Sequence, residues 1–127
     1  MKALRDAARV GAAAVFLACL NSAASAHAEL RRSIPAVGTT VPTAPTEVQV
    51  NFSEPLVSPF SSIIVRDAAG NRVDKADTRV DPDDRTTMHV SLQPLAPGNY
   101  TVLWRAVTTD THRTEGTYGF RVGAPAQ

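Results

Sequence analysis

From residue 46 onward, hydrophobic and polar residues alternate along the chain in short runs, which is the pattern of strands with one face turned to a core. In the run at 46–52 (TEVQVNF), Val48, Val50 and Phe52 fall on one face. Further candidate strands lie at 61–67, 86–92, 99–107 and 117–122, with a weaker one at 29–34. No window shows the period of an α-helix, so the pattern predicts an all-β domain.

The run at 99–107 (NYTVLWRAV) differs from the others because both of its faces are largely apolar, which suits a strand in the middle of a sheet. Its alternation turns Trp104 toward the core, on the same face as Tyr100. Tyr100 also follows Gly98 of a Pro-Gly turn by two residues. Its hydroxyl can therefore return to the preceding backbone, as in the tyrosine corner of immunoglobulin-like domains.

Turn-forming residues divide the chain into many short pieces. Nine prolines occur in 127 residues, and Pro- and Gly-rich breaks fall at 35–45, 53–60, 67–71 and 95–99. The Asp-rich stretch at 71–85 is expected to be an exposed connection, with room for one short strand near Val73 or Val80. About seven short strands without a helix predict an immunoglobulin-like Greek-key β-sandwich or barrel.

The first 26 residues have the three-part layout of a secretory signal peptide. A basic start is followed by an uncharged apolar run of 11 residues at 10–20 and by the small-x-small spelling of a cleavage site at 24–26 (ASA). A membrane span needs about 20 apolar residues, so this run is too short to be one. We expect cleavage after Ala26, an exported periplasmic domain at 27–127, and no stable insertion in a membrane.

In an alternative prediction for the N-terminal segment, Cys19 remains in the exported protein. The stretch FLAC at 16–19 loosely resembles a lipoprotein box, in which Cys19 would become a lipidated N-terminus and His27 would stay inside the chain. Cleavage after Ala26 instead removes the only cysteine together with three basic residues and one acidic residue. The 13 Lys+Arg and 12 Asp+Glu then become 10 and 11, a formal net charge of −1. That balance implies no polyanion-binding surface, so no nucleic-acid partner is expected.

The exported domain would contain all three histidines of the chain. His89 is out of phase with the apolar face of 86–92 and is expected to point outward. His112 lies in the loop between the two strongest strand candidates, two residues after Asp110. Side chains at i and i+2 of an extended segment leave the same face, so this carboxylate and imidazole can converge on one point. The D-x-H spacing alone is a weak signal for a metal.

Cleavage after Ala26 would make His27 the N-terminal residue. Its α-amine and imidazole can close a chelate on one metal ion, while His112 adds a third nitrogen and Asp110 an oxygen. Three nitrogens and one oxygen in a roughly planar array are what Cu(II) prefers, whereas Zn(II) would take the same donors in a tetrahedron. The one sulfur left, on Met88, is too little for a Cu(I) site.

These residues belong to longer motifs that resemble the CopC/PcoC family of periplasmic copper-resistance proteins. The motifs are HAEL directly after the signal, SIPAVGTTV at 33–41, VNFSEPL at 50–56 and YTVLWRAVTTDTHRTEGTYGFRV at 100–122. The resemblance covers essentially all of 27–127. It implies an immunoglobulin-like sandwich or barrel with a Cu(II) site made by His27, Asp110 and His112.

The resemblance also implies a role for Glu54 of the F-S-E segment, which lies close to the copper in the family. Its carboxylate can accept a hydrogen bond from a ligand imidazole or from the amine. The alternative for Glu54 is a solvated turn carboxylate. The chain departs from the Met-rich members of the family, because 61–87 contains neither Met nor His. One Cu(II) site is therefore expected, without a second site for Cu(I).

The expected function is that of a periplasmic Cu(II) carrier or buffer in copper homeostasis or resistance. Such a protein is not an enzyme, and it would pass copper to an inner-membrane copper transporter or another copper protein. Two alternatives are a histidine-brace copper oxygenase and a metal-free β-sandwich accessory module. An oxygenase needs an open copper position, which Asp110 would fill, and the chain offers no flat aromatic surface for a polymer.

Overall fold

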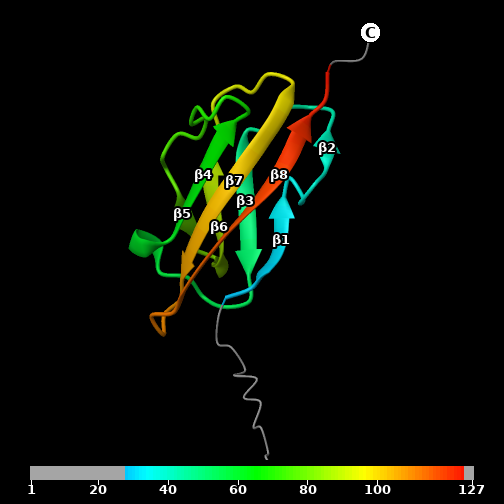
Figure 1. Ribbon diagram of the computed structural model, residues 1–127. Coiled ribbons are helices and arrows are strands. Elements are labelled where there is room, and N and C mark those ends of the chain that lie inside the picture. The colour runs from blue at the N-terminus through cyan, green and yellow to red at the C-terminus, as the bar shows by residue number, and fades with distance from the viewer. Residues whose placement is uncertain (1–27, 125–127) are drawn as a thin grey trace, which may run out of the picture.

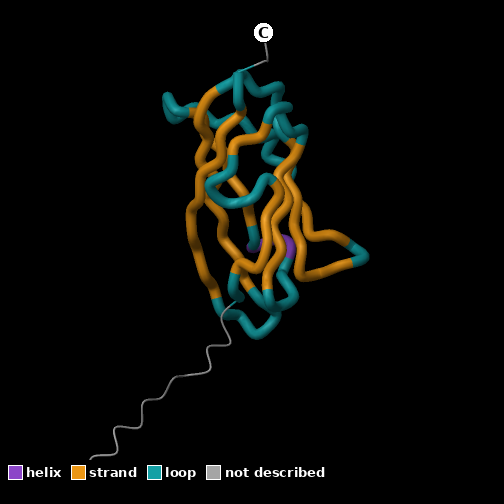
Figure 2. Tube along the Cα trace, turned by 90° about the vertical axis from the view of Figure 1, so that its right-hand side faces the viewer, coloured by secondary structure: helices purple, strands orange, loops and turns teal. Residues whose placement is uncertain are grey.

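The computed structural model describes residues 28–124, so the expected signal peptide and His27 lie outside the described residues. Eight strands and one 3-10 turn follow one another: β1 (Leu30–Ile34), β2 (Thr40–Val41), β3 (Glu47–Phe52), η1 (Ser58–Phe60), β4 (Ser62–Asp67), β5 (Arg79–Asp81), β6 (Asp84–Ser91), β7 (Gly98–Val107) and β8 (Arg113–Val122). The strands run lengthwise and the loops gather toward the two ends (Figure 1, Figure 2). This is the predicted all-β, immunoglobulin-like Greek-key sandwich.

Each layer of the sandwich is a four-stranded sheet. The first sheet has the order β1-β3-β6-β5 and is antiparallel throughout. The second has the order β2-β8-β7-β4, in which only β2 runs parallel to its neighbour. Because β7 lies between β8 and β4, the prediction that the doubly apolar run at 99–107 forms an inner strand is confirmed.

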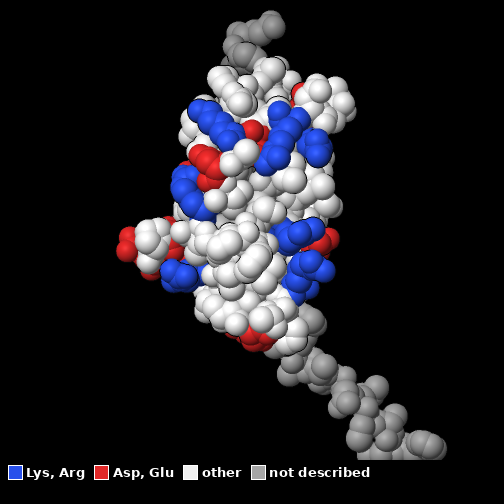
Figure 3. Space-filling view, turned by 90° about the vertical axis from the view of Figure 1, so that its left-hand side faces the viewer, with Lys and Arg blue, Asp and Glu red and all other residues white. Residues whose placement is uncertain are grey.

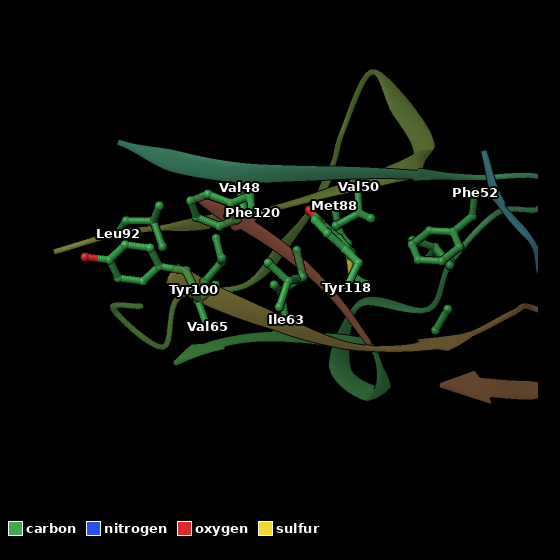
Figure 4. Packing of buried hydrophobic residues seen from close by; sticks show 14 of the residues in the cluster. Val48, Val50, Phe52, Ile63, Val65, Met88, Leu92, Tyr100, Tyr118 and Phe120 are labelled. Carbon is green, nitrogen blue, oxygen red and sulfur yellow. The ribbon is translucent and has the colours of Figure 1, made fainter. Parts of the chain in front are cut away.

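The core lies between the two sheets and is filled by alternate residues of both. Val48, Val50 and Phe52 of β3 are at most 1% exposed, as their spacing predicted. They pack with Met88 of the neighbouring β6 and with residues of the opposite sheet such as Phe120 (Figure 4). Burying a side chain of this size stabilises a domain by about 1.5–3 kcal/mol, so the alternation fixes which face of each sheet turns inward.

Two aromatic residues of β7 lie where the sequence placed them. The hydroxyl of Tyr100 donates a hydrogen bond of 2.5 Å to the carbonyl oxygen of Ala96, which is the predicted tyrosine corner. Trp104 packs against the core at its edge and is only partly buried. Its ring meets Phe52 edge-on, with 5.0 Å between the ring centroids.

The connection at 71–85 is less exposed than predicted. It does contain a short strand at Val80, but Asp74 is buried at 5% exposure, contrary to the expectation of a solvated carboxylate. The Asp74 carboxylate accepts hydrogen bonds from the backbone N–H groups of Val65 and Ala76, at 2.8 and 2.9 Å. The carboxylate therefore replaces a strand partner along the edge of β4, a role that the composition of an Asp-rich stretch does not indicate.

Two further boundaries differ from the sequence prediction. The break at 35–45 contains the short strand β2, which pairs with the end of β8. The last strand begins at Arg113 rather than at residue 117, because pairing with β7 continues to the end of the hairpin. The four residues RTEG at 113–116 have no apolar alternation, so only the partner strand reveals them as part of a strand.

The surface drawn in Figure 3 carries lysine and arginine side chains interspersed with aspartate and glutamate, and uncharged surface lies between them. No large area of a single sign covers this face. Among residues 28–124, no helix is long and apolar enough to cross a membrane.

Candidate metal centre

The D-x-H motif lies in the tight loop at 108–112, which joins β7 to β8. Backbone hydrogen bonds close this loop, from Thr108 N–H to the carbonyl of His112 at 2.9 Å and from Thr111 N–H to the carbonyl of Thr108 at 2.8 Å. Thr111, between the two motif residues, has a φ of 71°, a left-handed conformation that β-branched residues rarely adopt. The loop is therefore a specifically shaped turn held by two long strands.

Asp110 and His112 converge in this turn. His112 Nδ1 lies 3.1 Å from Asp110 Oδ2, and both side chains are about half exposed, at 50% and 49%. The sequence predicted the convergence, but for the wrong reason. The segment is turned at Thr111 rather than extended, so the left-handed residue and not strand alternation brings the two side chains together.

The Asp110 carboxylate is oriented by its own loop. The Thr108 hydroxyl, on a residue that is 2% exposed, donates a hydrogen bond to Asp110 Oδ1. This bond is the main reason that the pKa of Asp110 is lowered. Desolvation is the next largest effect and opposes it, while hydrogen bonds from the backbone N–H and the ring of His112 lower the pKa further. Asp110 is therefore held as a carboxylate that accepts hydrogen bonds.

The contact between the two side chains also bears on how His112 can bind a metal. When Nδ1 carries the ring hydrogen, it donates to Asp110 Oδ2, and the metal-binding lone pair is on Nε2. Carboxylates that accept a hydrogen bond from a histidine in this way fix its ring and raise its basicity as a metal ligand. Asp110 can thus act on a metal directly through oxygen or through His112.

The start of the described chain is held at the same end of the sandwich. Ala28 is 4% exposed, and its carbonyl oxygen accepts a hydrogen bond of 3.2 Å from the Thr114 hydroxyl of β8. The next residue, Glu29, exchanges two hydrogen bonds with Ser53: Glu29 N–H donates to the Ser53 hydroxyl at 2.9 Å, and Ser53 N–H donates to the Glu29 carbonyl at 3.0 Å. In Figure 1 these segments and the β7–β8 loop all lie toward the lower end of the molecule.

Glu54 lies between two of the contacts that build this end. Ser53 before it is bonded to Glu29, and Leu56 after it forms an isolated bridge with Thr108 at the base of the D-x-H loop. The Glu54 side chain is partly buried, and its carboxylate has no hydrogen-bond or ion-pair partner among residues 28–124. The backbone therefore places Glu54 at the same end of the sandwich as the D-x-H loop, and its carboxylate has no structural partner in the described part of the chain.

The two other candidate donors are used elsewhere. His89 points outward from β6 as predicted, but it is not simply solvated: its Nδ1 lies 3.1 Å from Glu47 Oε1 and its Nε2 lies 3.0 Å from Asp81 Oδ2. The Met88 thioether is fully buried in the core. Within the described residues, no three His, Cys, Asp or Glu side chains cluster as metal ligands, so Asp110 and His112 stand as a pair.

Sequence reasoning gave no positioning role to Thr108, Ser53 or Thr114. Thr108 has a local signal, because Ser and Thr hydroxyls often bond to groups two residues away in turns. Ser53 and Thr114 have none, since their partners lie 24 and 86 residues distant in the sequence. Their roles follow from the register of β1 and β8.

The fold and this site define a class of protein: a small Greek-key β-sandwich with a candidate metal centre where a D-x-H hairpin loop meets the entry of the first strand. The CopC domain model matches residues 30–123, and the chain belongs to this family.

The matches to known proteins extend over nearly the whole domain. The Copper transport protein CutJ of Bacillus subtilis is 33% identical over 110 residues, and the match covers 86% of this chain but only 20% of CutJ. The crystal structure of CopC from Methylosinus trichosporium OB3b superposes with a TM-score of 0.74 at 27% identity, covering 80% of this chain and 98% of that one. The structure of PcoC, a methionine-rich copper resistance protein from Escherichia coli, superposes with a TM-score of 0.65 at 36% identity, covering 76% and 99%.

Proposed function

We propose that this chain is an exported Cu(II)-binding protein that carries or buffers copper in copper homeostasis or resistance. Signal cleavage after Ala26 would release a domain at 27–127 into the periplasm. One Cu(II) ion would bind where the new N-terminus meets the D-x-H loop. The relatives named for copper resistance and copper transport support a copper-related role for the domain.

The donor set consists of the α-amine and imidazole of His27, the imidazole of His112 and the carboxylate of Asp110. An N-terminal amine with a pKa of about 7.7–8.0 loses its proton to a Lewis-acidic metal near neutral pH. Nitrogen donors with one oxygen match the preference of Cu(II), which also binds most tightly of the divalent first-row metals. A protein that carries this ion needs no general base or nucleophile.

One observation carries the proposal more than any other. Ala28, the residue after His27, is bonded to Thr114, which comes two residues after His112. Ala28 therefore lies beside the strand that follows the D-x-H loop, and adjacent Cα atoms in a chain are only about 3.8 Å apart. This position of Ala28 supports a donor set in which His27 joins Asp110 and His112 at one end of the sandwich.

The role of Glu54 in the proposed site is to support the ligands. Its carboxylate, which has no partner among residues 28–124, can accept a hydrogen bond from the His27 amine or from a ligand imidazole. Removing such a supporting group from a metal site typically costs about 10–100-fold in affinity. The proposed site uses no Cu(I) ligands, because the Met88 sulfur is buried in the core and 61–87 contains no methionine.

The copper would pass to an inner-membrane copper transporter or to another copper protein. CutJ is named as a copper transport protein, and only a fifth of its length matches this chain. A similar domain thus occurs within a much longer polypeptide whose name refers to transport. This supports a carrier that works beside transport machinery rather than a copper oxygenase or a metal-free accessory module.

Three measurements test the proposal. N-terminal sequencing of the exported protein should give His27 as the first residue; a start at Cys19, or a blocked amine, would remove the site. Cu(II) titration followed by EPR should then give one equivalent bound through nitrogen and oxygen. His112→Ala should alter the spectrum and lower the affinity, whereas the control His89→Ala should leave both unchanged. Oxygen consumption with a reductant should stay at the level of free copper, and rapid turnover would favour the oxygenase.

A further inference from the structure

A hollow of about 450 Å³ opens beside the D-x-H loop, on the outer face of the β2-β8-β7-β4 sheet. It is lined by Thr111 of the loop, by the arginines of the neighbouring strand ends and by the 3-10 turn η1, which Figure 1 draws near the loop. Because Thr111 separates Asp110 from His112, a molecule that fills the hollow would lie against the residue between the two candidate donors. Neither the donor set nor the core explains this hollow.

An exposed aromatic ring forms one wall of the hollow. Phe60 is 64% exposed, although most large apolar side chains of the domain are buried. The chain is anchored at the next residue, because Ser61 accepts a hydrogen bond from Val107 N–H at 3.0 Å and donates one to the Val107 carbonyl at 3.3 Å. Exposed aromatic side chains are characteristic of the energetic centres of protein interfaces.

Two arginines also line the hollow. Arg105 and Arg113 extend from β7 and β8 on the outer face of the sheet. Arg105 Nε is paired with Glu115 at 3.2 Å, and both side chains are about half exposed. Arg113 is exposed and has no ion pair or hydrogen bond from its side chain among residues 28–124. The hollow therefore offers positive charge beside an aromatic ring, and Arg and aromatic residues are enriched at interfaces.

We propose that this hollow, formed by Phe60, Arg105, Thr111 and Arg113, is the docking surface for an acidic segment of the protein that receives the copper. A carboxylate on the partner would pair with Arg113, and an apolar side chain beside it would pack on Phe60. The docked segment would bring its own copper ligands to the turn at Thr111. This inference rests on the proposed carrier function, since it concerns where the carried ion leaves.

The positive charge of the hollow favours an acidic partner. A basic segment would meet Arg113 with like charge, which raises the energy of the encounter and slows association. Complementary charges at a docking site raise association rates by about tenfold or more. We propose a protein segment rather than a small anion because Phe60 is well exposed. A small anion bound to the arginines would leave the Phe60 ring in water, whereas a protein segment can cover it.

The test uses two acceptor peptides that begin with the Cu(II)-binding sequence Gly-Gly-His and continue as alternating glutamate and leucine or as alternating lysine and leucine. The mature protein is loaded with one equivalent of Cu(II), and transfer is followed by the visible absorption of the peptide complex. Arg113→Glu should slow transfer to the acidic acceptor about tenfold and speed transfer to the basic one. Phe60→Ser should slow transfer to the acidic acceptor several-fold.

Arg121→Glu is the matched control, because Arg121 is exposed on β8 at the opposite end of the strand. It should change neither rate. Equal effects of Arg113→Glu and Arg121→Glu, or no effect of either, would overturn the docking surface. Each variant should keep the wild-type Cu(II) affinity and thermal midpoint, which separates docking from metal binding and from folding.

A second experiment uses the protein without copper. Amide spectra of the metal-free protein, titrated with the glutamate–leucine sequence alone, should shift at residues 60–62, 105 and 111–113. Equal shifts from inorganic sulfate at the same ionic strength would assign the hollow to a small anion and overturn the protein partner. A wild type that fails to retain Cu(II) at the loading step would overturn the proposed function, while these metal-free spectra would still test the docking surface.

Discussion

The hydroxyl of Thr114 donates a hydrogen bond of 3.2 Å to the carbonyl oxygen of Ala28 across 86 residues of sequence. This contact holds the chain one residue after His27 beside the strand that follows the D-x-H loop. Local sequence fixes the Asp110–His112 pair, but the approach of the N-terminal segment depends on packing at Ala28 and on this hydrogen bond.

Thr114→Val is expected to weaken Cu(II) binding. The substitution keeps the shape of the side chain but leaves the Ala28 carbonyl without its donor, at a cost of about 0.5–1.5 kcal/mol. At about 1.4 kcal/mol for each factor of ten, the affinity should fall about two- to tenfold. A competition titration against a Cu(II) chelator measures this change. Thr117→Val, exposed on the same strand, is the control, and an equal loss in both variants would contradict the role of Thr114.

Thr108→Val is expected to loosen the Asp110 carboxylate. The variant removes the hydrogen bond that is the main cause of the lowered pKa of Asp110, so both the pKa and the orientation of the side chain should change. Cu(II) affinity at pH 7 should fall about tenfold, as for other groups that orient a metal ligand. Thr108→Ser, which keeps the hydroxyl, should restore most of the loss. Identical affinities for the Val and Ser variants would show that the hydroxyl is dispensable.

Gly116→Ala should disturb the only tryptophan. A Cβ at Gly116 would lie 2.4 Å from Trp104 Cζ2 and 2.7 Å from Cε2, so the ring would have to shift, which would disturb its edge-on contact with Phe52. Overpacking of this kind costs about 1–3 kcal/mol. Urea unfolding and the emission maximum of Trp104 measure the two effects. Gly119→Ala on the same strand, whose Cβ would only reach 3.4 Å from the Tyr100 carbonyl, should show neither.

The buried carboxylate of Asp74 should make stability depend on acid pH. Burial on its own raises the pKa of Asp74, but hydrogen bonds from the Arg72 side chain and from backbone N–H groups outweigh it, so the net pKa is lowered. A lowered folded-state pKa means that the ionised carboxylate stabilises the fold above its ordinary unfolded pKa of about 3.9. That contribution is lost as the pH falls through the lower value in the folded protein.

Asp74→Asn should therefore destabilise the domain at pH 7 by about 1–3 kcal/mol, because an amide cannot accept all the hydrogen bonds of the carboxylate. The difference from wild type should shrink below about pH 4, where the carboxylate of the unfolded chain becomes protonated, and should be lost as the pH falls through the lower pKa of the folded protein. Urea unfolding at pH 7 and pH 3 measures both quantities. Asp83→Asn, on an exposed turn, is the matched control. A destabilisation by Asp74→Asn that is the same at both pH values would refute the linkage.

Met88→Leu should leave copper binding unchanged. The Met88 side chain is fully buried between the sheets, so its sulfur contributes packing rather than a metal ligand. A swap of similar volume should cost less than about 1.5 kcal/mol of stability. Cu(I) competition with a coloured chelator should detect no tight Cu(I) site in either protein. A Cu(I) affinity that the substitution removes would disprove the single-site proposal.

The sequence by itself determined the class of fold and half of the candidate centre. The alternation at 46–52 was sufficient to place Val48, Val50 and Phe52 in the core, because burial is the dominant energy and has a period of two in a strand. The turn before Tyr100 likewise predicted its hydrogen bond, since both partners are local. The pairing of Asp110 with His112 was also a local prediction.

Only the tertiary structure decided what depends on contacts between distant segments. Asp74 is buried because it bonds to the edge of β4, and β8 extends back to Arg113 because β7 continues to pair with it, while neither segment has an apolar pattern of its own. Hydrogen bonds with Thr114 and Ser53 hold Ala28 and Glu29 at the end of the sandwich that carries the D-x-H loop. Such partners are chosen by strand register, which the whole sandwich fixes and no single stretch of sequence encodes.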